Sequence, residues 1–258
     1  MKKLLYLFSA VALTLTSCSS DDSSDPTTTE GTTLKKIIET YSDGSIETTN
    51  FFYNGNKIIK QTTDYGDEVQ YTYTGDLITK ERYLFEDGDS GDILEEIITY
   101  EYDTNNRLIK STRTDEDNYV EVDVFTYNAN GTTSFVTTAD GNTIATGTIH
   151  YVGNQPYKKE IIQNEGDEFE STTTEVSTFD TKRSPYSNIT GFSKTIIASP
   201  YTSRGYPGIV NNPLLLTVNG ISQESSSYTY NASNMPATET VIYFGSTDEN
   251  STSEYFYN

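Results

Sequence analysis

The stretch Tyr100–Lys110, YEYDTNNRLIK, decides how this chain folds. Two aromatic residues stand at alternate positions, a polar turn rich in Asp and Asn follows, and an aliphatic pair then precedes a lysine. Alternation of period two, followed by a turn and a second apolar run, is typical of a β-hairpin. The stretch therefore predicts two antiparallel strands joined by the polar turn.

The same unit recurs along the chain. Copies begin at Phe51, Tyr71, Phe125, Ile149, Ser177, Tyr228 and Tyr255, some of them weak. The second aromatic residues of successive units lie 20, 29, 25, 24, 28, 51 and 27 residues apart, and the long gap has room for two units. A period near 25 suits one hairpin with its turns. The sequence thus predicts an all-β fold of antiparallel up-and-down hairpin repeats, about fifteen strands in all, forming a strongly curved sheet or barrel-like shell.

Alternation within the strands indicates one buried and one wet face, as in antiparallel sheets. Val120, Val122 and Val124 face one way, whereas Glu121 and Asp123 face the other. No useful helical periodicity follows residue 34.

The shell is expected to be water-soluble rather than a membrane barrel. A spanning barrel needs a lipid-facing apolar band on every strand. Lys80 and Arg82 are expected to share a face with Ile78, and many strands alternate threonine with glutamate. Charges on such faces do not suit contact with lipid.

The first residues predict export and a lipid anchor. Lys2 and Lys3 precede an apolar run that is too short to span a bilayer but suits a cleaved signal peptide. The run ends Leu15-Thr16-Ser17-Cys18, which resembles the bacterial lipobox. That resemblance implies that residues 1–17 are removed and that Cys18 carries the lipid. The alternative is a plain secretory peptide with a chance cysteine.

Residues 18–33 are expected to form the lipidated cysteine and a disordered tether, because they contain almost no apolar side chains. Asp21 and Asp22 resemble the acidic export signal of Bacteroidota lipoproteins, which implies an outer-membrane lipoprotein exposed at the cell surface. The alternative is a solubilising spacer. The net charge of −21 makes nucleic acid and anionic lipid head groups poor partners. The expected contact with the membrane is therefore the lipid anchor on Cys18.

The unit Tyr100-x-Tyr102-Asp103-x-x-x-Arg107-Leu108 resembles the YD repeat of RHS-type proteins. As a whole, residues 34–258 are similar to Bacteroidota lipoproteins that contain a domain of unknown function with a porin-like β fold. The segment Phe179–Ile189, followed by Asn211-Asn212-Pro213, looks like the irregular insert of such lipoproteins, and we expect the insert at about residues 180–222. The resemblance implies a fold and no activity.

No catalytic residues are assigned. A single histidine, His150, and a single cysteine argue against triad chemistry and histidine-rich zinc sites. Asp87, Asp89 and Asp92 lie in a glycine-bearing loop that could supply oxygen ligands to calcium, the one candidate cofactor. The alternative is a solvated hairpin turn.

Candidate binding residues lie in the irregular segment: Tyr186, Tyr201, Arg204 and Tyr206. Long irregular loops in regular proteins are often functional, and tyrosine rings can stack on sugars. The alternative is a plug or cap over the open end of the sheet. The sequence favours a lipid-anchored surface protein with a non-enzymatic binding or structural role, whose partner is a glycan, a peptide or an envelope protein. The other hypothesis is a secreted carboxylate-dependent hydrolase acting on polysaccharide.

Overall fold

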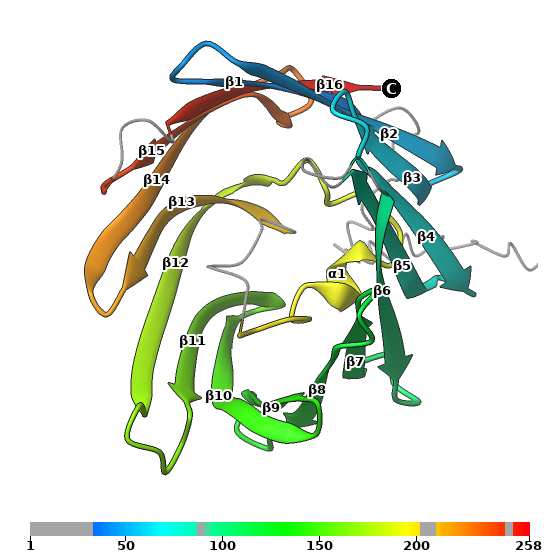
Figure 1. The fold of residues 1–258 in the computed structure, drawn as a ribbon. Coiled ribbons are helices and arrows are strands. Elements are labelled where there is room, and N and C mark those ends of the chain that lie inside the picture. The colour runs from blue at the N-terminus through cyan, green and yellow to red at the C-terminus, as the bar shows by residue number, and fades with distance from the viewer. Residues whose placement is uncertain (1–32, 87–90, 92, 202–209, 246–249) are drawn as a thin grey trace, which may run out of the picture.

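The computed structural model describes residues 33–86, 91, 93–201, 210–245 and 250–258. Sixteen strands close into an antiparallel barrel, in which neighbours along the chain pair with each other and the first strand pairs with the last (Figure 1). The prediction of an all-β barrel-like shell of up-and-down hairpins is confirmed, with sixteen strands in place of about fifteen. Among the described residues, no helix is long and apolar enough to cross a membrane.

The strands are β1 (Leu34–Tyr41), β2 (Ile46–Asn54), β3 (Lys57–Thr63), β4 (Glu68–Thr74), β5 (Leu77–Glu86), β6 (Ile93–Tyr102), β7 (Leu108–Thr114), β8 (Val120–Tyr127), β9 (Thr133–Ala139), β10 (Asn142–Val152), β11 (Gln155–Gln163), β12 (Ser171–Arg183), β13 (Asn211–Val218), β14 (Ile221–Tyr230), β15 (Pro236–Tyr243) and β16 (Ser251–Tyr257). One helical turn, α1 (Phe192–Thr195), lies between β12 and β13.

The second aromatic residue of each repeat unit stands at or near the end of an even-numbered strand. All of them therefore lie at one end of the barrel, which we call the tyrosine end. Several hydroxyls there donate to a backbone carbonyl of the preceding hairpin: Tyr102 to Ile78 (2.6 Å) and Tyr127 to Leu108 (3.0 Å). In these units the repeat tyrosine thus joins its hairpin to the one before it.

A β-bulge beside the repeat tyrosine changes which residues face inward. Thr72 pairs with Lys80 but Tyr73 pairs with Ile78, so Thr79 is the extra residue. Ile78 consequently points inward and is fully buried, whereas Lys80 lies opposite the exposed Thr72 on the outer face. The expectation that Ile78 shares a face with Lys80 and Arg82 is therefore wrong. Equivalent register shifts occur at Tyr53, Tyr102, Tyr151 and Tyr230.

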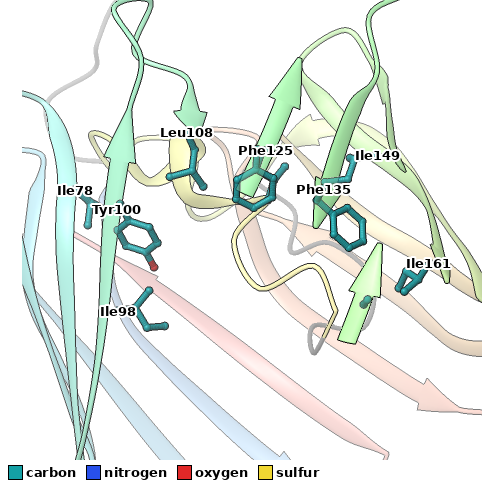
Figure 2. Close-up of a cluster of buried hydrophobic side chains, with 10 residues drawn as sticks. Ile78, Ile98, Tyr100, Leu108, Phe125, Phe135, Ile149 and Ile161 are labelled. Atoms are coloured by element: carbon teal, nitrogen blue, oxygen red, sulfur yellow. The ribbon is translucent and has the colours of Figure 1, made fainter. Parts of the chain in front are cut away.

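Inward-pointing side chains form a hydrophobic core along one side of the lumen. Figure 2 shows a row of them on successive strands: Ile78, Ile98, Tyr100, Leu108, Phe125, Phe135, Ile149 and Ile161. Gly147 leaves room for the ring of Phe135, because a Cβ at position 147 would lie 2.4 Å from that ring. On β8 the inner face carries Glu121 and Asp123, whereas Val124 is exposed on the outside. The barrel therefore encloses carboxylates as well as apolar groups.

An irregular insert follows β12 and enters the barrel, with α1 visible inside the ring of strands (Figure 1). Ile197 of the insert packs in the core cluster of β5 to β11, whereas Ile189 packs with Leu34, Phe51 and Ile58 of the first three strands. The insert thus bridges two parts of the wall. Gly191 permits a close approach of the insert to the turn before β5, since it has φ 80° and a Cβ there would lie 2.6 Å from the carbonyl oxygen of Asp76.

Candidate functional site

A cavity of about 490 Å³ lies between the insert and the wall formed by β1 to β6. We call it the acidic cavity, because its charged lining residues are the carboxylates Glu39 and Glu81. Its lining residues are Ile37, Glu39, Thr49, Phe51, Gln61, Tyr71, Glu81, Tyr83, Ile98 and Tyr100 from the wall, with Tyr186, Phe192, Thr195, Ile196, Ala198 and Ser199 from the insert.

Glu81 is the most buried acid of this cavity, with 5% of its surface exposed. Burial raises the pKa of Glu81, while hydrogen bonds from Tyr83 and Tyr100 oppose that rise. The Tyr83 hydroxyl donates to Glu81 Oε2 over 2.5 Å. The Glu81 carboxyl therefore takes up a proton more readily than a solvated glutamate does.

Glu39 on β1 lies at the seam where the first strand pairs with the last. It accepts a hydrogen bond of 2.6 Å from the hydroxyl of Ser251 on β16, 212 residues away in sequence. Pairing of the first strand with the last thus holds the carboxylate of Glu39, which lines the cavity.

Aromatic rings supply much of the remaining cavity surface. The rings of Tyr186 and Phe192 stack, with their centroids 5.4 Å apart and an interplanar angle of 23°. Tyr71 donates to Gln61 across 3.1 Å. Flat apolar ring faces beside carboxylate and hydroxyl oxygens suit a ligand with both C–H surfaces and hydroxyl groups.

Buried polar groups hold the insert in place. The Asp123 carboxylate accepts a hydrogen bond of 3.1 Å from the backbone N–H of Ser199, and the Lys159 ammonium donates to the carbonyl of Pro200 over 2.9 Å. Near α1, the Tyr73 hydroxyl donates to the carbonyl of Thr190 over 3.0 Å. These contacts attach the insert to β8, β11 and β4, and so fix the floor of the acidic cavity.

The two charged groups that hold the insert are strongly affected by burial. Burial raises the pKa of Asp123, despite hydrogen bonds from Thr137, Ser111 and Ser199. Burial also lowers the pKa of Lys159, while the neighbouring Glu175 carboxylate, 3.1 Å away, opposes that change. Each group therefore depends on its partners to remain charged.

Further carboxylates line the inner face beyond the acidic cavity. Glu239 accepts hydrogen bonds from Tyr228, at 2.5 Å, and from Tyr255. Glu96 pairs with Arg113 at 2.6 Å. Burial raises the pKa of Glu121, and the nearby Asp123 adds to that effect. Even so, within the described ranges no three His, Cys, Asp or Glu side chains are placed to hold a metal ion.

Of the binding residues expected from sequence, Tyr186 lines the acidic cavity. Tyr201 instead packs against the hydrophobic core cluster and is not among the cavity's lining residues. Arg204, Tyr206 and the calcium candidates Asp87, Asp89 and Asp92 lie outside the described residues, as do Cys18, the signal segment and nearly all of the tether. The outer-face His150 lies 3.0 Å from Glu160.

The sequence reasoning missed Glu39 and Glu81. A signal for Glu81 exists in the repeat. Each turn is followed by a buried residue, Ile78 in this unit, and the bulge makes the residue three positions later face inward. The residues at this position are polar in several units: Gln61, Glu81, Ser111, Lys159 and Glu239. Glu39 has no such signal, since it lies on β1, before the first repeat unit.

No protein-family model and no curated protein sequence matches the chain. Among solved structures, the chain is similar to a porin-like protein from Bacteroides uniformis, with a TM-score of 0.46, 16% identity, and coverage of 87% of this chain and 98% of that one. It is also similar to a porin-like protein from Bacteroides vulgatus, with a TM-score of 0.41, 11% identity, and coverage of 88% and 99%.

Proposed function

We propose that this protein is a lipid-anchored envelope lipoprotein that binds a glycan unit in the acidic cavity without chemically changing it. The cavity between the insert and β1–β6 is the observation that carries the proposal. Its volume of about 490 Å³ falls within the range of small-ligand sites, roughly 300–1,000 Å³.

The lining of the cavity favours a saccharide over a purely apolar ligand. The rings of Tyr186 and Phe192 offer faces for the C–H groups of a pyranose, while Glu39 and Glu81 offer oxygens to its hydroxyl groups. The insert is fixed by Asp123 and Lys159, so these rings are held in position before a ligand arrives. Such preorganisation lowers the entropy lost on binding.

The cellular location of the protein and its lipid anchor are part of the proposal. Cys18 carries the lipid, Asp21 and Asp22 direct the chain to the outer face of the outer membrane, and the degenerate repeat reflects kinship with YD-repeat proteins. Metabolic labelling with a fatty-acid analogue tests the anchor: label and membrane association should both be lost in Cys18→Ser. Retention of the label in Cys18→Ser would refute lipidation at this cysteine.

Binding is tested by melting the purified protein with a panel of neutral mono- and disaccharides. A ligand at a hundred times its Kd adds about 2.7 kcal/mol of stability, which for this chain length raises the melting midpoint by roughly 5–10 °C. Calorimetric titration of the best sugar should then show weaker binding in Glu81→Gln. The matched control is Glu101→Gln, which changes an exposed acid on the outer face. No sugar-dependent shift, or equal affinity in Glu81→Gln and the original protein, would count against this site.

One observation favours the alternative hydrolase. Burial raises the pKa of Glu81, and this carboxyl shares the cavity with a second carboxylate, Glu39. Glycoside hydrolysis uses such a pair, one group as the acid and the other as the base or nucleophile. The same saccharides are therefore incubated with the protein and assayed for new reducing ends. Turnover that Glu81→Gln abolishes would establish a hydrolase and replace the binding role, whereas tight binding with no turnover supports the lipoprotein as a binder.

A further inference from the structure

A second cavity, of about 480 Å³, lies at the tyrosine end. It is bounded by the turns that join β6 to β7, β8 to β9 and β10 to β11, and by α1. The lining residues on which the inference depends are Asn106, Arg107, Tyr127, Tyr151, Asn154 and Lys194. We call it the basic cleft.

The charge of the basic cleft is opposite to that of the chain as a whole. Among the described residues that line it, the charged ones are Arg107 and Lys194 and none is a carboxylate, although the chain has a net charge of −21. Arg107 pairs with Asp103 at 2.7 Å and lies 4.3 Å from the centre of the Tyr127 ring. Lys194 is exposed, and its ammonium has no hydrogen-bond or ion-pair partner within the described part of the chain.

The helical turn α1 separates the basic cleft from the acidic cavity. Phe192 and Thr195 line the acidic cavity, Ser193 and Lys194 line the basic cleft, and Ile196 lines both. This helical turn therefore presents an aromatic ring and a hydroxyl group to the acidic cavity, and a hydroxyl group and an ammonium group to the basic cleft. Ion pairing by Asp103 neutralises much of the charge of Arg107, so the uncompensated positive charge of the cleft belongs to Lys194.

We propose that the basic cleft is a second binding site, which takes a sugar-sized ligand bearing one carboxylate or phosphate group. Lys194 would bind the anionic group as a point charge, with Arg107 beside it. The rings of Tyr127 and Tyr151 and the side-chain amides of Asn106 and Asn154 would contact the rest of the ligand. The site is distinct from the acidic cavity, whose carboxylates repel such a ligand, so the inference goes beyond the proposed function.

Titration of the purified protein with galacturonate, galactose and inorganic phosphate, followed by calorimetry, tests the inference. Galacturonate should bind at least about tenfold more tightly than galactose, because only its carboxylate can pair with the ammonium of Lys194. Raising the salt concentration should weaken the binding. If phosphate alone binds, the same anionic chemistry is supported with phosphate as the source of the charge.

Charge reversal locates the site. Lys194→Glu should weaken anion binding at least about tenfold, whereas the matched control Lys35→Glu, an exposed lysine that lines neither cavity, should leave binding unchanged. Glu81→Gln should also leave it unchanged, which separates this site from the glycan site. Equal effects of Lys194→Glu and Lys35→Glu, loss of anion binding in Glu81→Gln, or no binding of either anion would overturn the inference.

Discussion

The interior of the barrel differs between its two ends. At the tyrosine end, each turn is followed by a buried residue such as Ile58, Ile78 or Leu108, and tyrosine hydroxyls bond backbone carbonyls. Three positions further along, the same strands turn polar groups such as Glu81 inward. The repeat therefore specifies the packed end. The inward-facing residues that differ from one hairpin to the next lie beyond it, around the acidic cavity and the insert.

The largest effect is expected where a buried charge holds the insert. Lys159→Met removes the partner of Glu175 and the donor to the Pro200 carbonyl, and loss of one member of a buried ion pair costs about 3–5 kcal/mol. We expect the melting midpoint to fall by roughly 10 °C or more. The measurement is calorimetric melting at neutral pH.

The double variant Lys159→Met with Glu175→Gln sharpens this test. It removes both charges, so it should recover a large part of the lost stability. If the double variant is no more stable than Lys159→Met, the cost lies in the contact with the insert rather than in the buried charge.

A slightly smaller loss is expected at the tyrosine end. Ile78→Ala leaves a cavity at a fully buried site, which costs about 2–4 kcal/mol. Denaturant unfolding should show a lower midpoint, whereas Ile59→Ala, at an exposed bulge residue, should change it little. Equal effects of the two variants would mean that the repeat aliphatic does not specify the packed end.

The tyrosine hydrogen bonds are expected to be worth less. Tyr102→Phe keeps the ring but removes the 2.6 Å bond to the Ile78 carbonyl, at a cost of about 1 kcal/mol. The melting midpoint should fall by roughly 2–4 °C. An unchanged midpoint would show that packing alone joins the hairpins at this end.

The smallest effect concerns pH. Burial raises the pKa values of Glu81 and Asp123 above those of the unfolded chain, about 4. The stability that these groups contribute is therefore fully present below about pH 4 and is lost as the pH rises through their folded-state pKa values. The variant with Glu81→Gln and Asp123→Asn should lose less stability than the original protein as the pH rises from about 4 to neutrality. A pH profile parallel to that of the original protein would contradict the buried positions of these acids.

The sequence was sufficient to predict the fold class because the hairpin signal is local. Tyr100–Lys110 contains the end of β6, the start of β7 and the turn between them, and nearly the whole wall repeats that unit. Which side chains point into the barrel was harder to predict, since the bulge at Thr79 reverses the alternation and places Ile78 and Lys80 on opposite faces. Neither composition nor period reveals that reversal.

Most of the candidate site could not be predicted from the sequence. Tyr186 was singled out because it lies in the irregular insert, and it does line the acidic cavity. Glu39 lies on β1, before the first repeat unit, and Glu81 faces inward because of a bulge in the hairpin of β4 and β5. The repeat contains a signal for Glu81 that becomes readable only once the strand pairing is known, whereas no repeat position marks Glu39.

Closure of the barrel has a consequence for how the protein is made. The side chain of Asn258 donates to the hydroxyl of Thr33, 225 residues away, and β1 has β16 as one of its two neighbours. During synthesis, one edge of β1 therefore stays unpaired until the last strand has been made. Unpaired edges invite association with other chains, and contacts of such long range form slowly. Truncation just before β16 would accordingly leave two edges exposed and produce a chain prone to aggregation.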